Sequence, residues 1–235
     1  MAALTVLVDA LASGEVEIVD LTQPLSDQTS LLKLPEPFTN TPGFKLHELS
    51  NYDDRGPAWY WNSFEGGEHI GTHFDAPIHW VTGKDGDDVA QVPPRRLVGP
   101  AVVIDRSADA SDDPDYLLTV EDIRAFEAEH GAIPADSWLL YRTGWDTRAQ
   151  DQDAFLNANE TGPHTPGFSI ECAQWLAEES PFIGVGVAPT PAPRTPSTRP
   201  SRATASCWGP ASTGSPSSPI SPSSRRSARS SWRRR

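Results

Sequence analysis

The sequence predicts a mixed α/β domain followed by a C-terminal segment of different composition. Short β-rich runs alternate with segments that carry helix-capping signals, as in layered α/β proteins. Between two of the expected strands lies a cluster of three histidines and one aspartate, interrupted by glycine and proline. After Val187 the hydrophobic periodicity stops, and proline, serine and arginine dominate the chain.

The N-terminal half is expected to contain one helix and several strands. Residues Thr5–Ala12 can form a short helix, and the alternating residues Glu17–Leu21 indicate a strand. Further strands are expected at Lys45–Leu49, at the aromatic run Ala58–Phe64 and at the buried run Ala101–Asp105.

The second half contains two helices with clear start signals. Thr119 can cap a helix in which Asp122 occupies the reciprocal position of a capping box, and Gly131 ends it. Ser169 can cap a second helix that runs through Glu178. Strands are expected before and after this second helix, at Trp138–Tyr141 and at Phe182–Val187.

Charge is divided unevenly along the chain. All 32 acidic residues lie in residues 1–187, whose formal charge is −22, whereas residues 188–235 hold nine arginines and carry +9. An acidic body repels phosphate, which argues against nucleic acid as a partner. No run reaches the roughly 18 apolar residues of a membrane span, and the start lacks a signal peptide's basic region. We therefore expect a cytoplasmic protein with no membrane partner, and Cys172 and Cys207 suggest no disulfide framework.

A candidate metal site lies between His69 and His79, where three of the six histidines and one carboxylate fall within 11 residues. Imidazole and carboxylate groups are standard ligands of zinc and manganese. On a strand the even spacings place His69, His73, Asp75 and His79 on one face. A straight strand would separate His69 from His73 by about 13 Å, so the chain must bend, and Gly71 and Ala76-Pro77 can supply the bends. The alternative is a histidine-rich surface loop.

The remaining histidines and several tryptophans carry weaker signals. His130 precedes a helix end, where a cation suits the helix dipole, and His164 lies in a proline-rich loop from which it can stabilise a turn or approach the site. His47 has no distinguishing context. Four tryptophans can line an aromatic substrate pocket or pack in the core: Trp59, Trp61, Trp80 and Trp145.

The motif His69-x-Gly-Thr-His73-x-Asp75-Ala-Pro-x-His79 resembles the signature of the cyclase family, which includes bacterial kynurenine formamidases and isatin hydrolases. The resemblance extends over about residues 16–187, through the segments 19–25, 142–145 and 166–169. It implies a swivelling β/β/α domain, usually a homo-oligomer. It also implies Zn2+- or Mn2+-dependent hydrolysis of a small-molecule amide, either an N-formylkynurenine-like formamide or a cyclic amide.

The resemblance also assigns roles to the residues of the motif. His69, His73 and Asp75 would be metal ligands, and Asp75 would bridge two ions in members with a binuclear centre. His79 would bind the second ion or act as the acid/base group beside a single one. We therefore expect a metal site of His69, His73, Asp75 and His79, with His79 also catalytic.

The segment 188–235 does not continue the family pattern. Family members continue with Gly-x-Asp-Thr, a proline-rich loop, a histidine and a Leu-Leu-Gly-Ala-Gly strand. Restoring one lost base at codon 188 permits such a string. We therefore interpret residues 1–187 as a C-terminally incomplete hydrolase domain and residues 188–235 as a disordered tail that is out of frame.

Other interpretations of the tail are an Arg/Ser segment for RNA or an acidic partner, and a linker. If the tail is out of frame, the last strand, Phe182–Val187, can be left at the edge of its sheet. The protein is then either an active amide hydrolase or an inactive remnant of one.

Overall fold

The computed structural model describes residues 2–187. The interpretation of residues 188–235 as an out-of-frame tail, and Cys207 with it, lies outside the described residues. The helices are α1 (Ala2–Ser13), α2 (Ser107–Asp112), α3 (Val120–His130), α4 (Gln152–Leu156) and α5 (Ile170–Glu178). Short 3-10 turns are η1 (Pro77–His79), η2 (Val81–Gly83), η3 (Pro94–Leu97) and η4 (Trp145–Arg148).

Strands in the described residues form one three-stranded sheet and three two-stranded ribbons. The sheet has the order β3 (Ala101–Asp105), β5 (Trp138–Arg142), β9 (Gly184–Val187), and both pairs are parallel. The ribbons pair β1 (Lys45–Asn51) with β2 (Tyr60–Glu65), β4 (Leu117–Leu118) with β8 (Gly167–Phe168), and β6 (Ala158–Asn159) with β7 (Gly162–Pro163).

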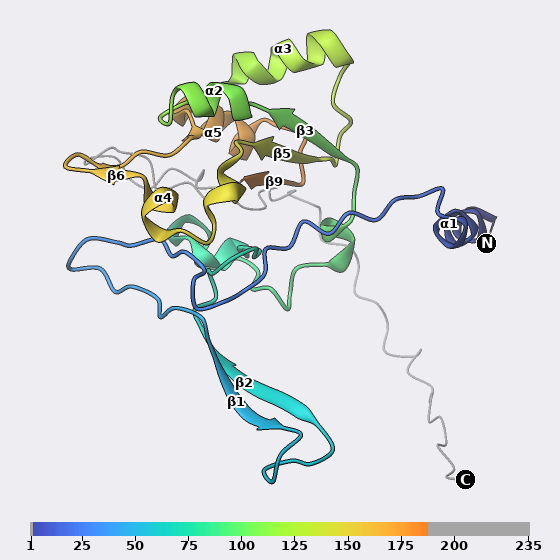
Figure 1. The fold of residues 1–235 in the computed structure, drawn as a ribbon. Coiled ribbons are helices and arrows are strands. Elements are labelled where there is room, and N and C mark those ends of the chain that lie inside the picture. Colours follow the sequence, from blue (N-terminus) through green and yellow to red (C-terminus); the bar gives the residue numbers. More distant parts are fainter. Residues whose placement is uncertain (1, 188–235) are drawn as a thin grey trace.

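Helices α2, α3 and α5 lie on one side of the three-stranded sheet, and the loop that carries the histidine cluster lies on the other (Figure 1). The hydrophobic core fills the helical side, where Leu139 and Tyr141 of β5 pack with Ile123 of α3 and Leu176 of α5. Because successive side chains of a strand point to opposite faces, Trp138 and Leu140 of β5 point to the other side of the sheet. The expected mixed α/β class is confirmed.

Two glycines of β9 make room for these side chains. Gly184 pairs with Trp138 and Gly186 with Leu140 across the ladder. A Cβ on Gly184 would lie 2.5 Å from the Trp138 ring, and one on Gly186 would lie 2.8 Å from Leu140. Because β9 lacks side chains at these positions, the Trp138 ring lies across the strand.

The helix ends follow the capping signals. Thr119 accepts a hydrogen bond from the Asp122 N–H at 3.2 Å, and Asp122 accepts one from the Thr119 N–H at 2.8 Å, which completes the capping box. Ser169 accepts from the Cys172 N–H at 3.0 Å, and α3 ends before Gly131 as expected. Cys172 itself is a free, buried core residue.

The expected strand Glu17–Leu21 is wrong. Nearby N–H groups bind side chains instead of a neighbouring strand, with Thr22 donating to Asp20 and Gln23 donating to Thr72. Ile18, Val19 and Leu21 are exposed. A β-rich pattern makes a strand only where a partner chain pairs with it, and no described residue does so here.

The expectation that Ala101–Asp105 is buried is also wrong, although the strand itself is confirmed. β3 lies at the edge of the sheet, and only Ile104 among its residues is buried. Within residues 2–187, no helix is long and apolar enough to cross a membrane.

Asp122 is a hub that joins α3 to the rest of the helical layer. It accepts hydrogen bonds from the Tyr116 hydroxyl at 3.1 Å and from Arg106 at 3.2 Å, besides those of the cap. Burial acts to raise the pKa of Asp122, but the hydrogen bonds from Thr119 and Tyr116 outweigh it, and the pKa is lowered.

We predict that Asp122→Asn lowers the free energy of unfolding by about 1–3 kcal/mol, because it removes a charged acceptor with several donors. Urea unfolding measures this change, and Glu121→Gln, which neutralises an exposed acid of the same helical turn, is the control. Since the folded pKa of Asp122 is lowered, its stabilisation is present above the unfolded pKa of about 4 and is lost as the pH falls through the folded pKa. A difference between wild type and Asp122→Asn that stays constant down to pH 2 would contradict this assignment.

Candidate metal centre

The histidine cluster lies on the irregular loop that follows β2, residues 66–76 (the metal loop), and on the 3-10 turn η1 at the end of this loop. Gly71 has φ +59°, in the left-handed region, and a Cβ there would lie 2.5 Å from Leu25. Thr72 anchors the loop by accepting a hydrogen bond from the Gln23 N–H at 2.9 Å. Ala76 is extended before Pro77, which starts the 3-10 turn η1 that carries His79. The two expected bends are confirmed.

Asp75 lies at the centre of the cluster and is buried. Its Oδ1 lies 2.6 Å from His69 Nδ1 and 3.2 Å from His73 Nε2. The rings of His69 and His79 are in contact, with centroids 3.8 Å apart and planes inclined by 34°. The loop therefore gathers all four residues of the motif around one carboxylate.

The four residues are not equivalent in their geometry. His69, Asp75 and His79 each offer a ligand atom, and these atoms all lie within 4.8 Å of one another. His73 reaches the group through Asp75, and its Nδ1 is hydrogen-bonded to the Gly71 carbonyl at 2.8 Å. The sequence spacing alone did not separate His73 from the other three.

Neighbouring groups and burial shift the pKa values of two of the histidines in opposite directions. The hydrogen bond with Asp75 raises the pKa of His73, against the effect of burial. Burial and the neighbouring His69 lower the pKa of His79. At neutral pH, His79 is therefore held in its neutral form, which can bind a metal or accept a proton. On His73, a metal must compete with the proton that Asp75 stabilises.

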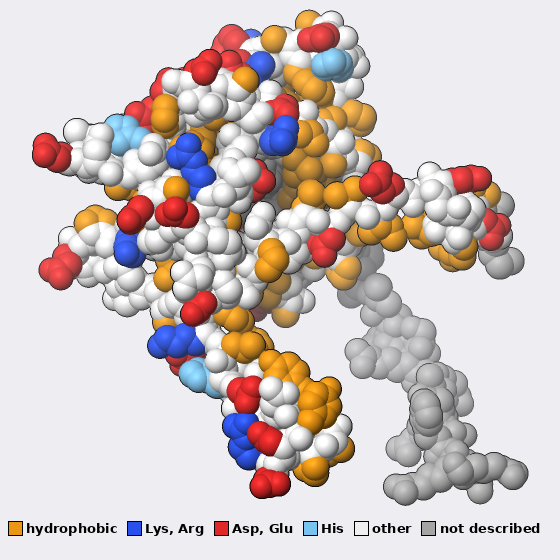
Figure 2. All heavy atoms as spheres, in the orientation of Figure 1, with side chains coloured by type: hydrophobic (Ala, Val, Ile, Leu, Met, Phe, Trp, Pro, Cys, Tyr) orange, Lys and Arg blue, Asp and Glu red, His pale blue; other side chains and the backbone are white. Residues whose placement is uncertain are grey.

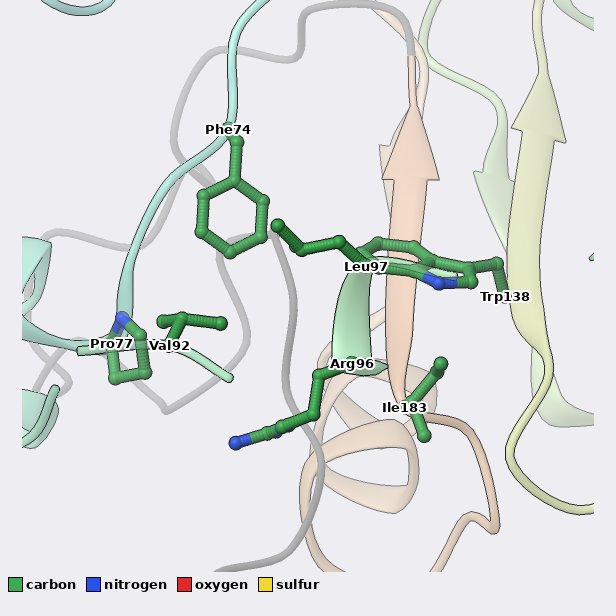
Figure 3. Close-up of a pocket in the computed structure, with 7 residues that line it drawn as sticks. All are labelled: Phe74, Pro77, Val92, Arg96, Leu97, Trp138 and Ile183. Carbon is green, nitrogen blue, oxygen red and sulfur yellow. The ribbon is translucent and has the colours of Figure 1, made fainter. Parts of the chain in front are cut away.

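The metal loop also lines a mostly apolar hollow. Phe74, between His73 and Asp75 in the sequence, points towards Leu97 and the Trp138 ring (Figure 3). Leu97, Trp138 and Ile183 line the hollow with it. Sequence reasoning missed this support, although an apolar residue that alternates with candidate ligands is a signal for it.

The other histidines lie outside the cluster. His164 Nδ1 lies 2.6 Å from Asp115 Oδ2, and its Nε2 lies 2.8 Å from Thr161 Oγ1, so it joins its loop to the segment that contains Asp115. His130 is the last residue of α3, as expected, and His47 is exposed on β1 at 3.8 Å from Glu65.

Of the four tryptophans, the structure brings only Trp80 to the site, with its ring centroid 4.7 Å from that of His79. Trp145 is buried and donates from Nε1 to the Phe155 carbonyl at 2.9 Å, which is a packing role. Trp59 and Trp61 are exposed in the β1–β2 hairpin. The structure therefore does not gather these four residues into one substrate pocket.

The donor set fits a divalent metal. Ligand bonds to zinc are about 2.0–2.2 Å for histidine and carboxylate, so ligand atoms within 4.8 Å of one another can surround one ion after small side-chain movements. Two imidazoles and a carboxylate suit Zn2+ or Mn2+. The fold and the site together define an α/β protein with a candidate metal centre of the type that hydrolases use.

Comparison with known proteins agrees with this class. A family model described as putative cyclase matches residues 19–189. The isatin hydrolase of Roseibium aggregatum is 50% identical over 187 residues, which are 78% of this chain and 71% of that protein. The chain belongs to the cyclase family.

Two solved structures of isatin hydrolases are also similar to this chain. Isatin hydrolase A from Ralstonia solanacearum is 49% identical with a TM-score of 0.75, over 78% of this chain and 71% of that one. An isatin hydrolase bound to the product analogue thioisatinate is 48% identical with a TM-score of 0.76, over 79% of this chain and 72% of that one.

We predict that the protein binds Zn2+ or Mn2+ and that His69→Ala or His73→Ala weakens binding by more than about 100-fold, the upper range for residues that only orient a ligand. Titration calorimetry of metal-free protein measures the affinity, and elemental analysis measures the retained metal. His130→Ala, which removes an exposed imidazole from a helix end, is the control. A well-folded protein that takes up no metal would overturn the assignment.

Proposed function

We propose that this protein is a metal-dependent hydrolase that opens a small cyclic amide, with isatin as the first substrate to test. The observation that carries the proposal is the group of His69, Asp75 and His79 around a common point. It occurs in a chain that is 50% identical to an isatin hydrolase.

We propose a cyclic amide rather than a formamide as the substrate because similar proteins are named isatin hydrolases. Both substrate classes follow from the cyclase-family resemblance, but the relatives with 45–50% identity named isatin hydrolases favour the ring substrate. N-formylkynurenine is the second substrate to test.

In the proposed reaction, His69 and Asp75 would hold the metal, His73 would join them from the other side of Asp75, and His79 would stay free beside them. A bound divalent ion supplies Lewis acidity, which lowers the pKa of water and polarises a carbonyl. Asp75 keeps His69 and His73 oriented by its hydrogen bonds.

His79 is the proposed proton carrier because it is exposed at the rim of the cluster and its pKa is lowered. It accepts a proton from water as the oxygen adds to the amide carbon. It then delivers the proton to the nitrogen as the C–N bond breaks, leaving an amine and a carboxylic acid, which loses its own proton to water and becomes a carboxylate.

The second candidate is an inactive remnant of such an enzyme. Its support is the position at which similarity ends: the family match stops at residue 189, and the chain contains no Asp, Glu, Leu or Val after Val187. In the proposed division, residues 1–187 are the hydrolase domain and residues 188–235 are out of frame.

Asp75→Asn is expected to reduce isatin hydrolysis by more than about 100-fold while circular dichroism stays unchanged, because the amide keeps the shape but loses the charge. Asp85→Asn, an exposed aspartate with a side chain 86% exposed, is the matched control. Rates are measured with isatin and with N-formylkynurenine, with Zn2+ or Mn2+ added, in this chain and in the repaired chain described next. Near-normal turnover by Asp75→Asn would assign Asp75 a structural role.

Restoring one base at codon 188 is expected to raise the activity from little or none to that of a working hydrolase, because the restored segment returns a family-like strand and a histidine. A site needs its groups held to within about 0.5 Å. Sequencing of the gene around codon 188 and rates of the two chains test this. Equal activity of the given chain and a chain cut after Val187, at the level of the repaired one, would show that residues 1–187 suffice.

A further inference from the structure

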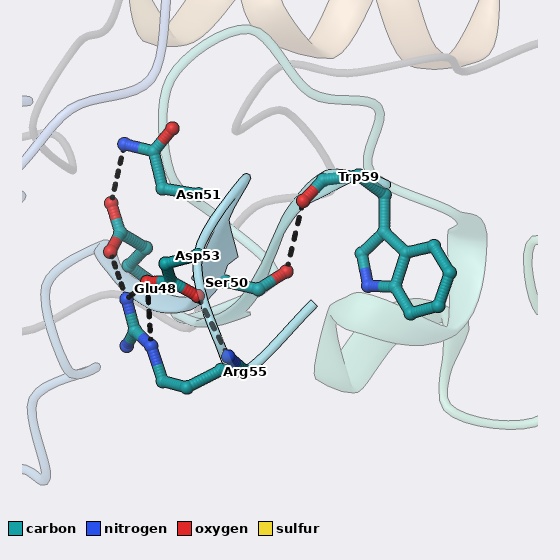
Figure 4. Close-up of polar contacts among 6 residues, drawn as sticks. All are labelled: Glu48, Ser50, Asn51, Asp53, Arg55 and Trp59. Atoms are coloured by element: carbon teal, nitrogen blue, oxygen red, sulfur yellow. Dashed lines mark hydrogen bonds and ion pairs between the residues drawn. The ribbon is translucent and has the colours of Figure 1, made fainter. Parts of the chain in front are cut away.

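The metal loop follows directly after the β1–β2 hairpin, which is held together by its own polar contacts (Figure 4). Near the tip, Arg55 binds Glu48 at 2.7 Å and Asp53 at 2.5 Å, and Ser50 Oγ donates to the Trp59 carbonyl at 3.2 Å. The hairpin projects from the body of the molecule (Figure 1, Figure 2). Its internal order therefore does not fix the place of the metal loop relative to the three-stranded sheet.

A different segment joins the metal loop to the body. Residues 22–31, called here the strap, contact Gly71 and Thr72 in the middle of the metal loop. The Gln23 N–H donates to Thr72 Oγ1 at 2.9 Å. A Cβ on Gly71 would lie 2.5 Å from Leu25, so this leucine packs directly on the bend, where the φ of Gly71 is +59°.

Two glutamine side chains hold the strap in turn. Gln152 forms a pair of hydrogen bonds with the backbone of Leu31: its Nε2 donates to the carbonyl and its Oε1 accepts from the N–H, both at 2.9 Å. Gln150 Nε2 donates to the Pro24 carbonyl at 3.0 Å, and Gln150 Oε1 accepts from Ser26 Oγ at 2.8 Å. Because an amide side chain both donates and accepts, it can bind a backbone segment as a neighbouring strand would.

The segment that carries the two glutamines is itself fixed to the body. It follows β5 and contains the buried Trp145, whose Nε1 donates to the Phe155 carbonyl at 2.9 Å. Arg148 lies 3.7 Å from the centroid of the Trp145 ring and donates to the Ala154 carbonyl at 3.3 Å. These contacts join the turn η4 to helix α4, so the two glutamines start from a well-packed base.

We propose that Gln150 and Gln152 position the metal loop through the strap. The two amides hold the strap, and the strap holds the middle of the metal loop, which lies between His69 and His73. Metal ligands must be held to within about 0.5 Å of their places. A loosened strap is therefore expected to weaken metal binding. This consequence rests on the candidate metal centre, whereas the contacts themselves do not.

A purely structural role of the glutamines predicts a different result. If they only stabilise helix α4 and the turn before it, their replacement lowers the free energy of unfolding but leaves the metal affinity of the folded protein unchanged. If they position the metal loop, the amides and Thr72 act in series along one set of contacts. Their effects on metal binding are then not additive.

Titration calorimetry of the metal-free full chain with Zn2+ tests the proposal. Gln152→Met, which has a similar length but no amide, and Thr72→Val are each expected to weaken binding by about 5-fold. The double variant is also expected to lose about 5-fold, and not the roughly 25-fold of independent effects. Gln28→Met, which replaces an exposed glutamine of the strap, should bind Zn2+ like the wild type. Wild-type affinity in Gln152→Met, or a 25-fold loss in the double variant, would overturn the proposal.

Amide hydrogen exchange of the metal-free protein gives a measurement that needs no metal. The Gln23 N–H, which donates to Thr72, is expected to exchange faster in Gln152→Met than in the wild type or in Gln28→Met. Circular dichroism confirms that each variant is folded. Unchanged exchange at Gln23 in Gln152→Met would refute the proposal, even if this variant is less stable. A wild type that binds no Zn2+ would contradict the metal centre, and the exchange rates then decide by themselves whether the glutamines position the loop.

Discussion

One buried carboxylate organises the candidate metal centre. Asp75 is almost enclosed by protein, and a buried charge is costly unless partners compensate for it. His69 and His73 contact the same carboxylate oxygen, and the tilted ring of His79 packs against His69. Residues spaced along an extended chain can meet in this way only if the chain curves around the carboxylate, which explains the bends at Gly71 and Pro77.

The curve of the metal loop depends on its packing against the face of the sheet that the helices do not cover. Phe74 packs towards Trp138, whose ring has room because Gly184 carries no side chain. On the other face, α3 and α5 hold β5 in place through the core, and the Asp122 hub fixes the start of α3. The position of the carboxylate thus depends on packing on both sides of a small sheet.

The sequence by itself determined the features that depend on near neighbours in the chain. The capping box of Thr119 and Asp122, the cap at Ser169, the strand β5 and the bends at Gly71 and Pro77 all follow from local residues, and so does the four-residue motif. Tertiary structure decided the rest. Glu17–Leu21 is not a strand because no described segment pairs with it, and β3 is half exposed because it lies at an edge. Only the packing of Phe74 and the curve of the loop place His69, Asp75 and His79 together, with His73 reaching them through Asp75, since spacing along a chain does not specify its path in space.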